Sequence, residues 1–263
     1  MKRAAACLWI GVLFSACGPQ DRSRTEMEDP GGPPPPGTPC VPTADTEAVC
    51  DDMVDNDCDG VRNCEDPDCS GVGDCPVCGE AQHLEGMPLA LPDDGSGTSA
   101  YVSTIEITGF PGLALEDVAQ FHGVCVNMEH SWLRDLQIEL TSPDGAVITL
   151  QQFLGQNGGE VYMGMPNDDD GVAPTPGVGA DYCWTPVATN PPMLDMANST
   201  GVHDLPPGDY QAVSGFGGLV GTTLNGAWTI RVTDWWAADN GFIFAWGLNF
   251  DPNLVEDCSI PID

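Results

Sequence analysis

Basic side chains are scarce in this chain of 263 residues. Lys and Arg together number 7, against 40 Asp and Glu, and the formal net charge is −33. A protein that binds nucleic acid needs basic groups to neutralise phosphates, so this balance argues against a nucleic-acid partner. An acidic surface fits divalent cations, or serves solubility alone.

A long apolar run is also lacking. The apolar run at residues 4–14 is too short for a transmembrane helix. It follows two basic residues and ends at Ser15-Ala16-Cys17, which is the pattern of a secretory signal, so residues 1–16 are expected to be a signal peptide.

The cysteine that follows Ser15-Ala16 resembles that of a bacterial lipoprotein signal, in which Cys17 would become the lipidated first residue. An ordinary signal peptide with a chance cysteine is the alternative. Gly18 resembles the residue found in lipoproteins that some bacteria send to the outer membrane. The resemblance implies a chain attached to the outer membrane or cell surface through its lipid only.

Residues 17–39 are rich in Pro and Gly and are expected to form an extended tether. Residues 40–80 hold seven of the 12 cysteines. So short and acidic a segment cannot bury much apolar surface and needs disulfides or metal. Cys75 and Cys78 have a zinc-like or redox-like spacing, but an exported chain favours disulfides.

Acidic residues alternate through residues 55–66, which read DNDCDGVRNCED. Alternate oxygen ligands on a sharply turning loop are what a calcium ion requires, and Gly60 allows the turn. A solvated acidic turn braced by disulfides is the alternative. A second, weaker loop starts at Asp66 and includes Asp68. The expected calcium ligands are Asp55, Asp57, Asp59, Val61, Asn63, Asp66 and Asp68.

The flanks of this loop lack helical periodicity, and its twelfth position is Asp66 rather than Glu, so it does not match a helix-loop-helix EF-hand. With Cys58 and Cys64 inside it, the loop resembles the calcium repeats of thrombospondin type 3. Calcium is therefore the expected cofactor.

Residues 135–150 read DLQIELTSPDGAVITL and predict a β-hairpin. Apolar and polar residues alternate through 136–141, the turn is Ser-Pro-Asp-Gly, and a second strand begins at Val147. Further strands are expected at residues 99–107, 123–128, 228–232 and 242–250, with residues 81–98 as a connector.

The run Asp-Leu-x-Ile-x-Leu-x-Ser-Pro-x-Gly at residues 135–145 resembles the signature of the P domain (Homo B domain) of proprotein convertases. The resemblance continues at residues 226–234 and 241–248. It implies an all-β, jelly-roll β-sandwich over residues 99–252, followed by a tail at 253–263, with no catalytic residues of its own.

Residues 155–207 lose the strand pattern, and so long an insert is usually functional or locally braced. Cys125 and Cys183 are the two cysteines inside the sandwich, so we expect them to form a disulfide, which leaves Cys258 to bond to the Cys-rich module. The like charges of the insert suggest a second cation site. Its residues would be Asp168, Asp169, Asp170 and Asp181.

Gly-Thr-Ser-Ala at residues 97–100 resembles a subtilase serine motif, and His122 could be considered as the catalytic base for Ser99. Ser precedes His here, the reverse of the subtilase order, and the chain has no room for the α/β catalytic domain, so no enzyme is expected. His130 is expected to make a structural hydrogen bond. Four tryptophans at expected loops or strand ends are candidates for surface recognition. They are Trp132, Trp184, Trp235 and Trp236.

The leading interpretation is a non-catalytic, calcium-binding bacterial surface lipoprotein, with a role in adhesion or assembly through a protein or glycan partner. The alternatives are an accessory or stabilising module of a secreted subtilisin-like protease system, and a carbohydrate-binding module. The fold does not choose among them.

Overall fold

The computed structural model describes residues 40–254, except 45, 48, 53, 78–79, 111–113, 156 and 168–173. Cys17, Cys78, Cys258 and Asp168–Asp170 lie outside the described residues. The strands are β1 (Glu80–Ala90), β2 (Tyr101–Ile107), β3 (Phe121–His130), β4 (Leu136–Thr141), β5 (Val147–Gln151), β6 (Tyr162–Met163), β7 (Ala180–Trp184), β8 (Asp204–Leu205), β9 (Gly208–Tyr210), β10 (Gly226–Asp234) and β11 (Gly241–Phe250).

One α-helix, α1 (Met193–Thr200), lies in the described part of the chain. No helix among the described residues is long and apolar enough to cross a membrane. Single 3-10 turns are η1 (Asn63–Glu65), η2 (Pro67–Cys69), η3 (Val118–Gln120), η4 (Leu133–Asp135), η5 (Phe216–Leu219) and η6 (Pro252–Leu254).

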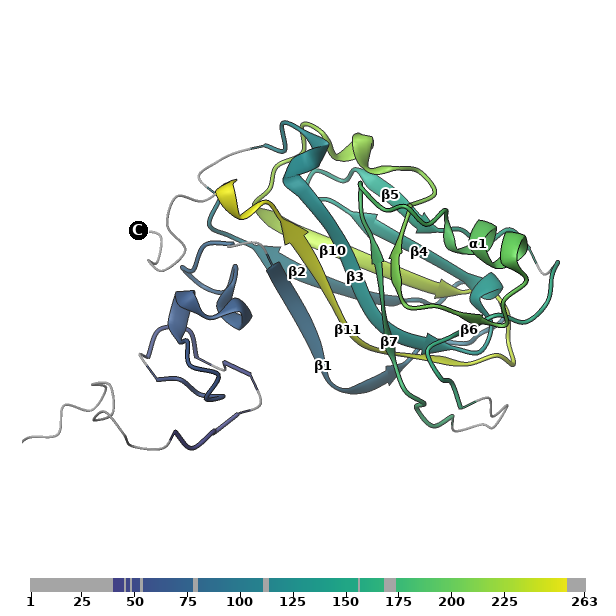
Figure 1. Ribbon diagram of the computed structural model, residues 1–263, viewed down its shortest axis with the longest axis horizontal. Coiled ribbons are helices and arrows are strands. Elements are labelled where there is room, and N and C mark those ends of the chain that lie inside the picture. The colour runs from purple at the N-terminus through teal and green to yellow at the C-terminus, as the bar shows by residue number, and fades with distance from the viewer. Residues whose placement is uncertain are drawn as a thin grey trace, which may run out of the picture. The chain divides into compact units, whose positions relative to one another are not determined.

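The strands form two sheets that pack face to face (Figure 1). One sheet has the order β1-β11-β3-β6-β8, with β7 also paired to β3 and β9 to β7, and the other has the order β2-β10-β4-β5. The expected all-β sandwich is confirmed. Its core lies between the sheets, where alternate residues of each strand are buried, as expected for strands with one face on a core. These residues include Val124, Val126, Ile138, Leu140, Trp228, Ile230 and Leu248.

The predicted hairpin is present as β4 and β5. Leu136, Ile138 and Leu140 are fully buried, while the residues between them are half-exposed. Gly145 takes a φ of 83°, which a glycine adopts without strain, and its N–H donates to the carbonyl of Ser142 at 2.9 Å. The hairpin therefore follows directly from its alternation and its turn residues.

The expected connector at residues 81–98 is wrong in its first half, which belongs to β1. This strand pairs antiparallel with β11 and is interrupted between Leu84 and Leu89 by a shift in register. Its sequence contains Gly86 and Pro88, which weaken a central strand but are tolerated at the edge of a sheet. β1 lies at such an edge.

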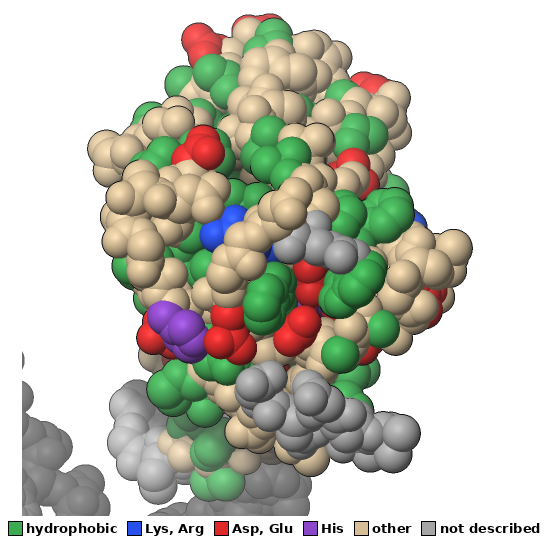
Figure 2. Space-filling model, turned by 90° about the vertical axis from the view of Figure 1, so that its right-hand side faces the viewer, with side chains coloured by type: hydrophobic (Ala, Val, Ile, Leu, Met, Phe, Trp, Pro, Cys, Tyr) green, Lys and Arg blue, Asp and Glu red, His purple; other side chains and the backbone are tan. Residues whose placement is uncertain are grey.

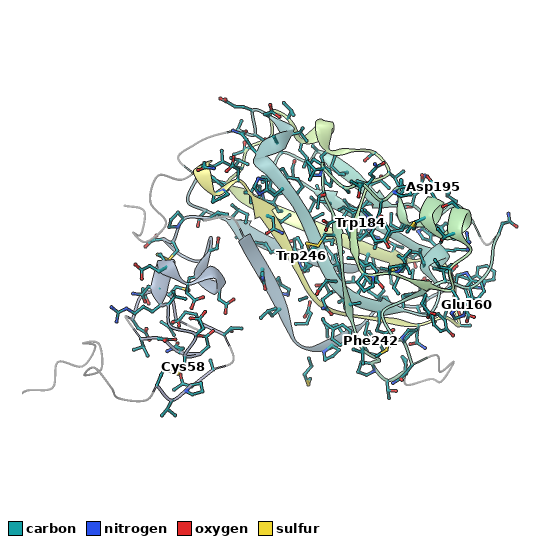
Figure 3. All side chains as sticks on the ribbon, viewed as in Figure 1. Cys58, Glu160, Trp184, Asp195, Phe242 and Trp246 are labelled. Atoms are coloured by element: carbon teal, nitrogen blue, oxygen red, sulfur yellow. A yellow bond between two sulfur atoms is a disulfide. The ribbon has the colours of Figure 1, made fainter. Side chains whose placement is uncertain are left out.

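The described part of the insert at residues 155–207 contains β6, β7, α1 and β8. Cys125 of β3 and Cys183 of β7 stand opposite each other in the ladder and form a disulfide with an S–S distance of 2.06 Å. Trp184, next to Cys183, is fully buried, and Figure 3 shows it inside the sandwich. The expectation of a surface role for Trp184 is wrong, because β7 joins the sheet and carries its indole into the core.

Candidate functional site: an acidic loop held by disulfides

Three disulfides hold the N-terminal module, which carries the acidic loop. They join Cys40 to Cys58, Cys50 to Cys69 and Cys64 to Cys75. Cys75 is therefore bonded to Cys64 and is not a ligand of a Cys75–Cys78 zinc site. Cys64, Cys69 and Cys75 form a small buried cluster of their own. The module thus relies on covalent links where a chain this short has little apolar core.

The loop turns because its carboxylates accept hydrogen bonds from its own backbone. Asp55 accepts from the N–H groups of Cys58 at 2.7 Å and Gly60 at 3.2 Å. Asp59 accepts from Val61 at 2.9 Å, and Gly60 has a φ of 104°. Aspartate favours such turns through its short side chain, so these bonds alone are consistent with a simple acidic turn.

Three carboxylates of the loop converge on one point. Asp57, Asp59 and Asp66 each place one oxygen so that all three oxygens lie within 4.8 Å of one another. Several oxygens converging on one point are what a hard cation such as calcium binds. Without a cation, the like charges of these side chains repel one another.

Asp66 is the buried member of this group. Asp66 is only 2% exposed, and its Oδ1 accepts a hydrogen bond from the N–H of Asp68 at 2.8 Å. Its Oδ2 is buried and has no hydrogen-bond partner in the described part of the chain. Burial raises the pKa of Asp66 above its ordinary value, and the charge of Asp59 raises it further. A bound cation would supply the partner that this oxygen lacks.

The remaining expected ligands are not members of that group of three. Asp68 accepts a hydrogen bond from the N–H of Glu47 at 3.2 Å. Asn63 opens η1, where its carbonyl accepts from Asp66 at 2.9 Å, and Val61 precedes it in the loop. Asp55 lies in a second group with Glu47 and Asp57.

Glu47 is a member of the site that the sequence pattern does not reveal. It lies outside the twelve-residue loop, and the Cys50–Cys69 disulfide ties its segment to the chain just beyond that loop. Glu47 is 5% exposed, and its Oε2 accepts from the N–H of Asn56 at 2.8 Å. Burial raises the pKa of Glu47. The one signal in the sequence is an acidic residue three positions before a cysteine of the module.

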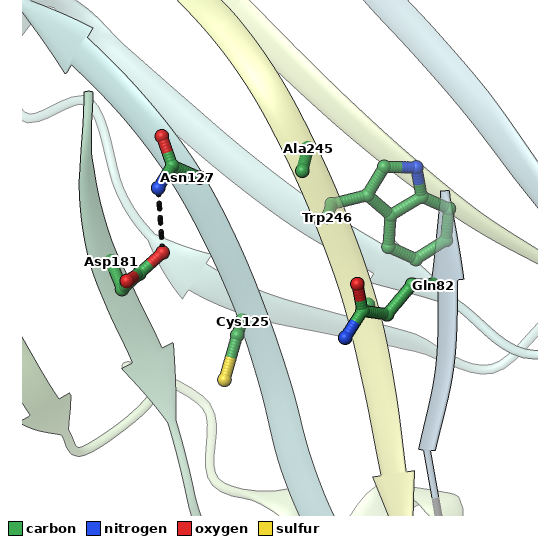
Figure 4. A pocket seen from close by; sticks show the side chains of 7 residues that line it. Gln82, Cys125, Asn127, Asp181, Ala245 and Trp246 are labelled. Carbon is green, nitrogen blue, oxygen red and sulfur yellow. Dashed lines mark hydrogen bonds between the residues drawn. The ribbon is translucent and has the colours of Figure 1, made fainter. Parts of the chain in front are cut away.

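The second expected cation site is represented only by Asp181, since its other three residues lie outside the described chain. Asp181 is on β7 and accepts a hydrogen bond from Asn127 of β3 at 2.7 Å (Figure 4). The pair borders a hollow of about 100 Å³ that Gln82, Cys125 and Trp246 also line. Asp181 thus has a structural partner, and the cation there stays a prediction.

A buried polar group lies where β3, η4 and β10 meet. His130 Nε2 is 3.3 Å from Asp234 Oδ2, and the N–H of Trp132 donates to His130 Nδ1 at 2.9 Å. Because Nδ1 accepts, the ring carries its proton on Nε2, which donates to Asp234. Burial and the charge of Asp234 raise the pKa of Asp135 to about 7. Both nitrogens of His130 are engaged, which agrees with the structural role expected for it.

Of Ser99 and His122, the pair considered for a catalytic role, only His122 lies on a strand. Ser99 comes just before β2, and its N–H donates to Asp94 at 2.8 Å, while His122 is on β3. A triad requires a hydrogen-bonded chain of nucleophile, base and orienting acid. The arrangement of Ser99 and His122 does not supply that hydrogen-bonded series.

The surface shown in Figure 2 carries many more acidic than basic side chains. Of the remaining tryptophans, Trp236 is 44% exposed. Trp132 and Trp235 are half-buried, and Trp235 stacks on Phe153 at a ring distance of 5.5 Å. Trp228 of β10 and Trp246 and Phe250 of β11 are buried and belong to the core, while Phe244 of β11 is half-buried.

Residues 121–162 match the family model of the proprotein convertase P-domain. The match confirms the P-domain resemblance. It begins with β3, includes the hairpin β4–β5 and ends at β6. The P-domain is a non-catalytic accessory domain, and together with the disulfides it indicates an exported protein.

Two solved structures align with 66% of this chain. One is the serine protease of Aeromonas sobria, at 18% identity, and the other is that protease in complex with the chaperone ORF2, at 17% identity. The TM-score is 0.30 for both, and this chain spans 27% of each of those chains. No curated protein sequence matches the chain.

Proposed function

We propose that this chain is a non-catalytic surface lipoprotein that binds calcium through its acidic loop and uses its P-domain sandwich for adhesion or assembly. The observation that carries the calcium proposal is the buried Oδ2 of Asp66, which lacks a hydrogen-bond partner among the described residues and lies in the group of Asp57 and Asp59. An ionised carboxylate left without a partner is costly, and a cation removes that cost.

Calcium would act on the folding of the module as well as on its charge. The unfolded loop has no preformed site, so the free energy of binding becomes free energy of folding. The three disulfides restrict the loop but leave the repulsion of its carboxylates in place. In this proposal calcium orders the module, and the ordered module presents the sandwich on the cell surface.

An accessory or stabilising role in a secreted subtilisin-like protease system is the second candidate, and the P-domain match over residues 121–162 favours it. The carbohydrate-binding alternative has less support, because Trp184, one of its candidate contact residues, is buried in the core. An exposed aromatic face is the usual platform for a sugar ring, and Trp236 is the most exposed of the four candidates.

The test is capture of surface-exposed partners by the mature chain, with calcium and with chelator. Asp59→Ala is compared with Asp74→Ala, a control that removes an exposed carboxylate of the same module outside the converging groups. A cell-surface partner captured only with calcium, and lost in Asp59→Ala alone, supports adhesion or assembly. Capture of a subtilisin-like protease supports the second candidate instead. Equal capture with chelator contradicts a role for calcium.

A further inference from the structure

We infer that the module holds two calcium ions that share the carboxylate of Asp57. The inference rests on the calcium binding proposed above and extends it. Two groups of converging carboxylates occur among the described residues: Glu47, Asp55 and Asp57 form one, and Asp57, Asp59 and Asp66 form the other. Within each group the three contributing oxygens lie within 4.8 Å of one another. Asp57 alone belongs to both.

Each group contains its own buried oxygen without a partner. Glu47 Oε1 and Asp66 Oδ2 are both buried and lack a hydrogen-bond partner among the residues that the structure describes. The two residues are 5% and 2% exposed, so water does not readily replace the missing partner. A single cation in one group would leave the oxygen of the other group unsatisfied, so the two orphaned oxygens indicate two ions.

The backbone fixes both of these side chains in place. Glu47 Oε2 accepts from the N–H of Asn56 at 2.8 Å, which leaves Oε1 for a second ligand. Asp66 Oδ1 accepts from the N–H of Asp68 at 2.8 Å, which leaves its Oδ2 in the same way. One oxygen of each carboxylate thus accepts a backbone hydrogen bond that orients the side chain, and the other is left for a cation, in the way that hydrogen bonds to metal ligands orient them.

The charge of the two carboxylate groups also indicates two ions. The five carboxylates carry a formal charge of −5, so one calcium ion leaves −3 and two leave −1. Residual like charge at close range in a partly buried site is unfavourable. A carboxylate has two oxygens, so Asp57 offers one to each ion, and calcium accepts the flexible oxygen geometry that such sharing requires.

The experiment is a count of calcium ions bound to the mature chain by native mass spectrometry and equilibrium dialysis, with calcium alone as the probe and the native disulfides verified by peptide mapping. Glu47→Gln and Asp66→Asn should each remove one ion from the wild-type count. Asp57→Asn should remove both, or weaken both by at least tenfold. The matched control is Glu65→Gln, an exposed acid of the same module, which should keep the full count.

Three results overturn the inference. If Glu47→Gln binds as many calcium ions as Glu65→Gln with the same affinity, while Asp66→Asn loses its ion, the module holds one calcium ion. The proposed function then survives and the two-ion inference does not. If Glu47→Gln and Asp66→Asn each abolish all binding, there is a single shared site. Absence of calcium in the wild-type chain defeats both proposals. Should Glu47→Gln fail to form its disulfides, Asp55→Asn removes a charge from the same group and should lose the same ion.

Discussion

Removal of the Cys125–Cys183 disulfide should destabilise the sandwich without unfolding it. Cys125 is half-exposed between Val124 and Val126, which are fully buried, so replacing both cysteines by alanine leaves the core side chains in place. The bridge spans 58 positions of sequence. The chain-entropy model gives about 4 kcal/mol of stability for a closed loop of this length.

That loss is less than the whole stability of most domains, which is roughly 5–15 kcal/mol. β7 keeps its ladder with β3 and its buried Tyr182 and Trp184, so the double variant should remain folded. For a domain of this size, the loss corresponds to a fall in Tm of about 8–16 °C.

The assay is urea unfolding and calorimetry of the mature chain, followed by tryptophan fluorescence of the sandwich. The control is the double variant Cys40→Ala and Cys58→Ala, which breaks a disulfide of the N-terminal module and should leave the sandwich transition unchanged. If Cys125→Ala with Cys183→Ala unfolds within about 1 kcal/mol of wild type, the loop-closure reasoning is wrong for this bridge.

Asp59→Ala should weaken calcium binding and increase proteolysis of residues 50–75 while the sandwich transition is unchanged, as limited proteolysis beside Asp74→Ala would show. Burial raises the pKa of Glu129 from 4.5 to about 7. Between these pH values the folded chain holds a proton that the unfolded chain has released, so the free energy of unfolding falls as the pH rises from 4.5 to about 7. Glu129→Gln should flatten this pH dependence and raise the free energy of unfolding at pH 8 by on the order of 3 kcal/mol over wild type, as measured by urea unfolding at pH 5 and pH 8. The prediction is refuted if the unfolding free energies of wild type and Glu129→Gln change in parallel with pH. The purified chain should not cleave casein, and cleavage that disappears in Ser99→Ala would overturn the non-catalytic assignment. Cys17 should carry lipid at the mature N-terminus by mass spectrometry, and an unmodified Cys17 with a start elsewhere would contradict the anchor.

The sandwich could be predicted from sequence where alternation and turn chemistry agree. The hairpin β4–β5 has both, and β3 and β10 have clear alternation, so their buried faces follow from the pattern. β1 could not be predicted, because Ala81 is its one described residue that is fully buried on the core side and Gly86 and Pro88 interrupt it. An edge strand with a break in register leaves little periodic signal.

The site was predictable where its ligands are close in sequence. Asp57, Asp59 and Asp66 come together as a loop that the sequence pattern indicates. Glu47 comes close to Asp55 and Asp57 through a fold that depends on disulfide connectivity, which the sequence does not provide. Trp184 was misplaced for a related reason: the pairing of β7 with β3 is a long-range contact, and Pro186 just beyond it favours a loop.

Calorimetric titration of the mature chain with calcium tests the central claim most directly, with limited proteolysis run in calcium and in chelator. The account predicts a binding heat for wild type and for Asp74→Ala, a weakened heat for Asp59→Ala, and protection of residues 50–75 only when calcium is present. No binding heat up to about 1 mM calcium, together with equal protease resistance in chelator, would contradict the account and leave a disulfide-braced acidic turn.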